Sequence, residues 1–153
     1  MATLISTPEA EVKSMGQVTI TFEVANNDDV QRTRERGAGG TRVRQVTLAD
    51  ALMDTGASHL CLPAEVIEQL GLPLDREVPV ETPTGLATLR VFQSARIAYA
   101  DRTAEVEAIE LARGSRPLFG ALAMEALGVE PDTRLPTVRV LPFGEAGRSF
   151  IRA

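Results

Sequence analysis

The sequence LADALMDTGASHLCLP, residues 48–63, is an apolar run that breaks at Asp54 and resumes at Leu60. Thr55 and Gly56 supply a tight turn between the two apolar halves. Aspartate is depleted in strands and is almost never buried without a partner, so its place in this run needs a reason. Either the carboxylate caps backbone N–H groups of the turn, or it takes part in chemistry.

The composition is that of one compact domain. The chain has 153 residues, of which 44% are hydrophobic, and this is enough to form a core without disulfides or bound metals. Cys61 is the only cysteine, which excludes a disulfide framework and a cysteine-based metal site and fits a reducing compartment. Residues 1–16 lack the pattern of a signal peptide, and no apolar segment reaches the length of a membrane span. We therefore expect a cytoplasmic protein that does not enter a membrane.

The segment 32–44 is rich in arginine. It contains one acidic residue, Glu35, and five arginines, which are Arg32, Arg34, Arg36, Arg42 and Arg44. The net charge of the whole chain is −5, which argues against nucleic acid as a partner, and no aromatic side chain accompanies the arginines. We interpret the segment as a solvated loop and keep a phosphate-binding arm as the lesser alternative.

Period-two alternation predicts most of the strands. Val18, Ile20, Phe22 and Val24 alternate with polar residues in the clearest of them. The expected strands are 17–26, 41–53, two within 78–92 around the turn at 82–85, two within 95–111 around Asp101 and Arg102, 117–120 and 137–143. We expect 17–26 and 41–53 to form a hairpin whose connection, residues 27–40, is a loop.

Two short helices complete the prediction. Both have an apolar face and end at a glycine, and they cover 63–72 and 121–128. Short, evenly spaced strands with one or two short helices indicate a mainly β fold, a small closed β-barrel. We expect this domain to cover residues 17–142, between a loose N-terminal tail (1–16) and a C-terminal tail (143–153).

Three features in order carry a resemblance to a known family. The sequence ALMDTGAS resembles the active-site motif of aspartic proteases, in which an apolar strand leads into Asp-Thr-Gly. Leu118, Phe119 and Gly120, followed by a helix, are similar to the strand that packs beneath the catalytic loop in that family. The hairpin at 82–85 lies between them, where the family carries its flap. One Asp-Thr-Gly triplet in a chain of this length, followed by Ala57, resembles the retroviral type in its bacterial or cellular form.

The resemblance implies a catalytic mechanism. Such enzymes are homodimers that cleave peptide or protein substrates with two aspartates, here Asp54 from each protomer, and they need no metal or organic cofactor. Two close carboxyls share one proton, so the rate should have a bell-shaped, acidic pH profile.

The resemblance also implies supporting roles. Thr55 would bond to the other protomer, Gly56 and Ala57 would complete the catalytic loop, and Ser58 would contact the substrate. The segment that would cover the substrate consists of Thr82, Pro83, Thr84, Gly85 and Leu86. Ser58 and Ala121 stand where retroviral enzymes usually have an Asp and an Arg that form an ion pair.

Other interpretations remain open. Asp54 could be a simple turn carboxylate, and the domain could be a catalytically silent module that binds peptides or acts as a scaffold. We interpret His59 as a polar residue at a strand edge, because no second histidine exists for a metal site, and Cys61 as a small buried hydrophobic residue.

Overall fold

The computed structural model describes residues 17–37 and 42–142, and these ranges contain nine strands and three helices. The strands are β1 (Thr19–Asn26), β2 (Gln45–Met53), β3 (Leu60–Pro63), β4 (Leu74–Thr82), β5 (Gly85–Tyr99), β6 (Arg102–Leu111), β7 (Leu118–Phe119), β8 (Val129–Asp132) and β9 (Thr137–Val140). The helices are α2 (Asn27–Arg36), α3 (Ala64–Leu70) and α4 (Ala121–Leu127). The two predicted tails, 1–16 and 143–153, lie outside the described residues.

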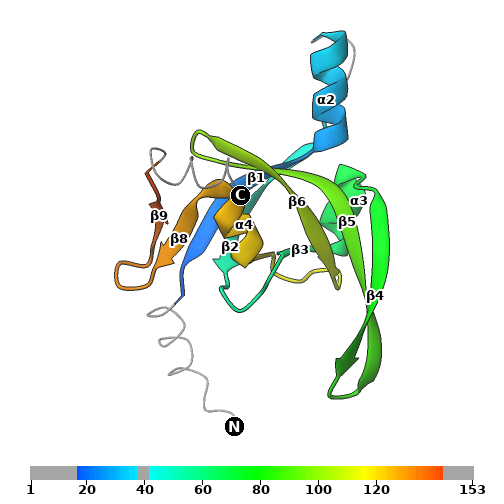
Figure 1. The fold of residues 1–153 in the computed structure, drawn as a ribbon, viewed down its shortest axis with the longest axis vertical. Coiled ribbons are helices and arrows are strands. Elements are labelled where there is room, and N and C mark those ends of the chain that lie inside the picture. The colour runs from blue at the N-terminus through cyan, green and yellow to red at the C-terminus, as the bar shows by residue number, and fades with distance from the viewer. Residues whose placement is uncertain (1–16, 38–41, 143–153) are drawn as a thin grey trace.

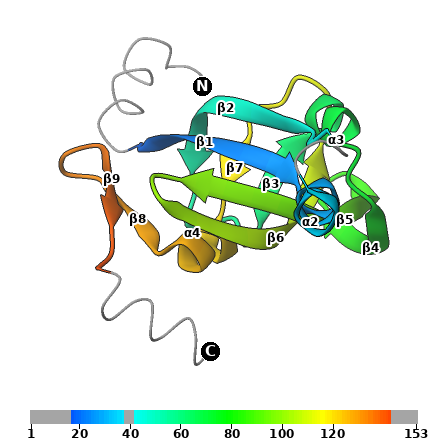
Figure 2. The same ribbon diagram turned by 90° about the horizontal axis from the view of Figure 1, so that it is seen from above.

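Six strands form a closed ring. Neighbouring strands follow the order β1-β2-β7-β3-β6-β5-β4, and an additional pairing of β1 with β5 closes the first six. β4 stays outside the ring, on β5, and the two form an arm that extends away from it (Figure 1 and Figure 2). The prediction of a mainly β fold is confirmed, and the closure predicted from strand spacing is found as this ring.

The ring is filled by the alternating apolar residues of its strands. Ile20, Phe22 and Val24 of β1 are at most 2% exposed, and the intervening residues of this strand's first half face outward. Phe22 meets Phe119 of β7 edge to face, with ring centroids 4.9 Å apart. Burial of this apolar face is the main force that holds the ring closed.

The connection between β1 and β2 is not the predicted loop. Residues 27–36 form helix α2, with Asn26 as its N-cap: the side-chain oxygen accepts a hydrogen bond from the Asp29 N–H at 3.0 Å. Two aspartates in the first turn and two arginines in the last complement the helix dipole. These signals are present in the sequence, but the helix has almost no apolar face, so a search for hydrophobic periodicity does not find it. β2 also begins at Gln45 rather than at 41.

The predicted strands on either side of residue 93 are one strand. β5 runs for 15 residues, and Ser94 lies in it at φ 69°, where the pairing with β6 shifts register. This bulge bends the strand, so that its first half pairs with β4 and its second half with β1.

Both predicted helices are found, and each ends at its predicted glycine. Gly71 follows α3 at φ 64° and Gly128 follows α4 at φ 70°, in the left-handed region where a side chain would be strained. Two strands were not predicted: β3, which lies between β7 and β6 in the ring, and β8, which pairs with β9 in a separate two-stranded sheet. No helix in the described ranges has the length and apolar character that a membrane span requires.

Candidate active site

The backbone at Asp54 is held from two sides. Met53, the last residue of β2, pairs in parallel with Phe119 of β7, and its N–H donates to the Val18 carbonyl at 2.9 Å. The Asp54 N–H donates to the Phe119 carbonyl at 3.1 Å. These hydrogen bonds fix the position of the Asp54 backbone at the end of β2. Asp54 itself is half-buried.

The Asp54 carboxylate closes the turn that follows it. Its Oδ1 accepts a hydrogen bond from the Gly56 N–H at 2.8 Å, and its main-chain carbonyl accepts one from the Ala57 N–H at 3.1 Å. A Cβ on Gly56 would lie 3.2 Å from the same Oδ1, which explains a glycine at this position. The contact expected of a turn-capping aspartate is thus present. In the part of the chain that the structure describes, it occupies only one carboxylate oxygen, and Oδ2 remains available to a water or a substrate.

The segment 118–122 supports the loop from beneath. The Ala121 N–H donates to the Ala57 carbonyl at 2.8 Å, and the Leu122 N–H donates to the Ser58 carbonyl at 2.9 Å. A Cβ on Gly120 would collide with the carbonyl oxygens of His59 and Ala57, the latter at 2.7 Å. The structure thus brings Leu118, Phe119 and Gly120 against the Asp54 loop, although 66 positions separate Gly120 from Asp54 in sequence.

Two hollows adjoin the loop, and Thr55 borders both. The first has a volume of about 360 Å³ and is lined by Asp54 together with Gln17, Val18, Leu52, Met53, Thr55, Pro131 and Thr133. The second has a volume of about 420 Å³ and lies between α4 and the β8–β9 sheet, where Ala121, Met124 and Val129 contribute apolar surface. Among the described residues that line the first hollow, Asp54 is the only acidic one.

Comparison with known families agrees with this geometry. A sequence model of a family described as aspartyl protease matches residues 39–126, which is more than half of the chain. The chain belongs to this family. The match includes the Asp54 loop, the β4–β5 arm, β7 and most of α4. No curated protein matches the sequence.

Within this aspartyl protease domain, the residues after the Asp54 loop join a polar network. Ser58 Oγ and His59 Nδ1 share a hydrogen bond of 2.7 Å, and His59 Nε2 lies 3.5 Å from Glu107 Oε1. Arg76, near the start of β4, binds Glu107 at 2.8 Å and, chiefly through these hydrogen bonds, holds the pKa of Glu107 below its ordinary value. The network links the Asp54 loop to the base of the β4–β5 arm. Sequence reasoning missed Glu107 and Arg76, because no local pattern marks charges that meet across strands.

The tip of the arm is an ordered turn. Thr82 Oγ1 donates to the Gly85 carbonyl at 2.7 Å and accepts from the Thr84 N–H at 3.3 Å. Gly85 has φ 125°, which other residues rarely adopt, and Leu86 is 79% exposed. Pro83 completes the turn. No hydrogen bond between described residues joins this tip to the Asp54 loop, so within one chain the structure does not bring the two together.

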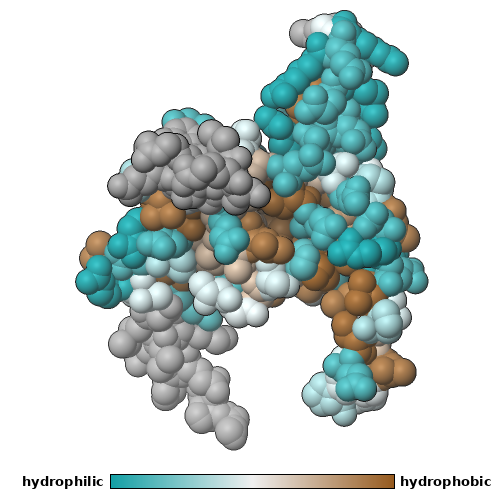
Figure 3. All heavy atoms as spheres, in the orientation of Figure 1, coloured by the Kyte–Doolittle hydropathy of each residue, from teal (hydrophilic) through white to brown (hydrophobic). Residues whose placement is uncertain are grey.

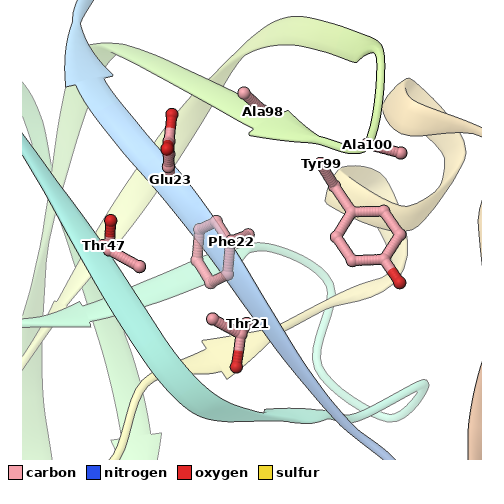
Figure 4. Close-up of a pocket in the computed structure, with 7 residues that line it drawn as sticks. All are labelled: Thr21, Phe22, Glu23, Thr47, Ala98, Tyr99 and Ala100. Carbon is pink, nitrogen blue, oxygen red and sulfur yellow. The ribbon is translucent and has the colours of Figure 1, made fainter.

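Cys61 and a third hollow do not belong to the candidate site around Asp54. Burial raises the pKa of the Cys61 thiol to about 11, so the thiol stays protonated and unreactive near neutral pH. The third hollow has a volume of about 280 Å³ and lies between β1, β2 and the β5–β6 turn. It is lined by Phe22, Glu23, Tyr99 and neighbouring threonines and alanines (Figure 4). None of the predicted site residues lines it, and we assign it no part in the aspartyl protease site.

Proposed function

We propose that this chain is an aspartic endopeptidase that acts as a homodimer, with one Asp54 from each protomer at a shared site. The observation that carries the proposal is the Asp54 carboxylate. It is fixed at a turn by the Gly56 N–H, with its second oxygen directed to no partner among the described residues, in a chain of the aspartyl protease family that has a single Asp-Thr-Gly triplet.

The chemistry of peptide hydrolysis is the reason for a second copy. A water must lose a proton as it attacks, and the carbonyl oxygen must gain one, so the site needs a base and an acid. The described residues that line the hollow beside Asp54 supply only one carboxyl. A two-fold dimer would place a second Asp54 opposite the first, and two carboxyls this close would share one proton.

The two carboxyls would then divide the work. The ionised carboxylate takes a proton from the water as the water oxygen bonds to the carbonyl carbon, and the protonated carboxyl donates to the carbonyl oxygen. The tetrahedral species then loses a hydroxyl proton to the second carboxylate while the first donates its proton to the nitrogen, and the C–N bond breaks. Both groups return to their starting states. The two carboxyls supply both the base and the acid, so this reaction needs no metal or organic cofactor.

Other residues would support this reaction. Thr55 borders both hollows beside the loop, a position suited to contact with the second protomer. Ser58 would contact the substrate backbone, and the tip formed by residues 82–86 would close over the bound peptide and exclude water. The lone buried Cys61 favours action in a reducing compartment, and we propose the cytoplasm.

The first test compares the wild type with Asp54→Asn on a diverse peptide library between about pH 3 and pH 8, a range that brackets a coupled pair of carboxyls. We expect cleavage by the wild type, with a rate that falls at both ends of the range, and none by Asp54→Asn. Asp50→Asn is the matched control, because it makes the same chemical change at an exposed position of β2. Cleavage that persists in a folded Asp54→Asn protein would exclude the proposal.

A peptide-binding module without hydrolysis is the second candidate, and the open edge of β4 favours it. β4 pairs only with β5 among the described strands, so its other side can accept an extended peptide by strand addition. This candidate predicts peptide binding that is unchanged in Asp54→Asn and no products from the wild type at any pH.

A further inference from the structure

Helix α2 is an insertion that the ring does not need. β1 and β2 pair directly, with Ala25 opposite Gln45, and a tight turn of a few residues would connect them. The chain instead places residues 27–44 between the two strands, and α2 projects from the ring at the end opposite the β4–β5 tip (Figure 1). Only Asn27 and Asp29 of this helix are buried, so α2 adds little to the core.

The base of this helix is nevertheless held firmly. Asp29 is 1% exposed, and its carboxylate accepts three hydrogen bonds from Arg44, which come from the backbone N–H, Nε and Nη2 at 2.8 to 3.0 Å. Asn26 Nδ2 donates to the Leu70 carbonyl at 2.9 Å, which fastens the start of the helix to α3. A ten-residue helix with Val30 as its one apolar residue would not be stable alone, so these contacts keep α2 in a fixed direction.

The segment as a whole has an excess of positive charge, because residues 27–37 and 42–44 contain five arginines and three carboxylates, those of Asp28, Asp29 and Glu35. Arg32 and Arg44 both pair with the single Asp29 carboxylate, and their side chains are 42% and 47% exposed. Arg36 lies one helical turn beyond Arg32 on the same side and, within the described residues, forms no ion pair. We call Arg32, Arg36 and Arg44 the arginine face. Figure 3 shows that the visible surface of α2 is mostly hydrophilic.

We propose that the arginine face docks an acidic segment of the protein substrate, away from the bond that Asp54 cleaves. Guanidinium groups match carboxylates in charge and geometry, and a fixed helix presents them without a large loss of conformational entropy on binding. An acidic protein segment fits better than a nucleic acid, because α2 and residues 42–44 carry no aromatic side chain on which bases could stack. That the docked protein is a substrate rests on the proposed function. That the arginine face binds an acidic segment does not depend on it.

The test measures binding rather than cleavage. The probe is a fluorescein-labelled peptide of about ten glutamates, a length sufficient to span two helical turns in extended form, titrated into full-length Asp54→Asn protein and followed by anisotropy at low salt. Adding Arg32→Gln and Arg36→Gln together should weaken binding about tenfold, as expected when two charged contacts are lost. Arg134→Gln, which removes an 82% exposed arginine in the turn between β8 and β9, should leave the affinity unchanged.

Two further variants keep the result independent of folding. Arg36→Glu changes an exposed position that holds no part of the anchor and should weaken binding by itself, whereas Glu35→Gln should strengthen it. Equal weakening in Arg134→Gln, or none in the double variant, would overturn the proposal. Tighter binding of a single-stranded DNA of equal charge through the same arginines would overturn it in favour of a nucleic-acid arm. Because all proteins carry Asp54→Asn, failure here is separate from failure of the protease assignment.

Discussion

Gly120 determines whether the Asp54 loop can pack against β7 and α4. A Cβ at this position would enter the space of the His59 and Ala57 carbonyls, which are backbone atoms and cannot rotate away. We expect Gly120→Ala to lower the free energy of unfolding by about 1 to 3 kcal/mol, the usual cost of overpacking. It should also reduce kcat strongly, because the Asp54 N–H is held by the neighbouring Phe119 carbonyl.

Gly114→Ala separates loop geometry from general destabilisation. Gly114 lies at φ 80°, and a Cβ added there would have no atom within 4 Å. Alanine at this position should therefore cost about 1 to 2 kcal/mol of backbone strain without touching the site. Chemical denaturation and peptide cleavage of both variants check the prediction. Equal kcat in the two variants would show that the Gly120 contact does not position Asp54.

Asp29 is the group on which the orientation of helix α2 depends. The hydrogen bonds from Arg44 are the chief reason that the pKa of Asp29 is lowered from 3.8 to about 2. A pKa that is lower in the folded state means that the ionised carboxylate stabilises the fold above the ordinary value, and that this contribution is lost as the pH falls toward 2. The wild type should therefore lose stability in this range.

Asp29→Asn should be less stable than the wild type near neutral pH by about 1 to 3 kcal/mol, because Arg44 and Arg32 lose their charged partner. Its stability should then change less between pH 5 and pH 3 than that of the wild type. Urea unfolding at several pH values measures this, with the exposed turn variant Asp101→Asn as control. If the free energy of unfolding depended on pH in the same way in the wild type and in Asp29→Asn, Asp29 would not be the source of the pH dependence, and the prediction would be wrong.

The proposed dimer makes a prediction that belongs to the whole molecule. If each active site needs one Asp54 from each copy, a mixed dimer of wild type and Asp54→Asn holds only one carboxylate and should not cleave. After subunit exchange with about nine copies of the variant per wild-type copy, the cleavage rate should fall to about a tenth. The measurement is the cleavage rate per wild-type chain after mixing with Asp54→Asn, compared with the rate after mixing with an equal amount of an unrelated protein. A monomeric enzyme would keep its full rate in both mixtures.

Much of the fold was predictable because its signals are local. Alternating apolar residues mark β1, Thr82 to Gly85 mark the tip of the arm, and Gly71 and Gly128 mark the ends of α3 and α4. Helix α2 escaped prediction because it is anchored by polar contacts rather than an apolar face, and β5 was divided in two because the bulge at Ser94 resembles a break between strands.

The sequence by itself determined the kind of chain this is: a mainly β domain with one Asp-Thr-Gly loop, a glycine that follows a short apolar strand, and a family that these motifs identify. Alternation, caps and turns act over a few residues, so they can be read along the chain. Only the tertiary structure decided which distant groups meet. Gly120 lies beneath the His59 carbonyl, Glu107 lies beside His59, and Arg44 pairs with Asp29, since ring closure brings together strands whose contacts no local pattern encodes.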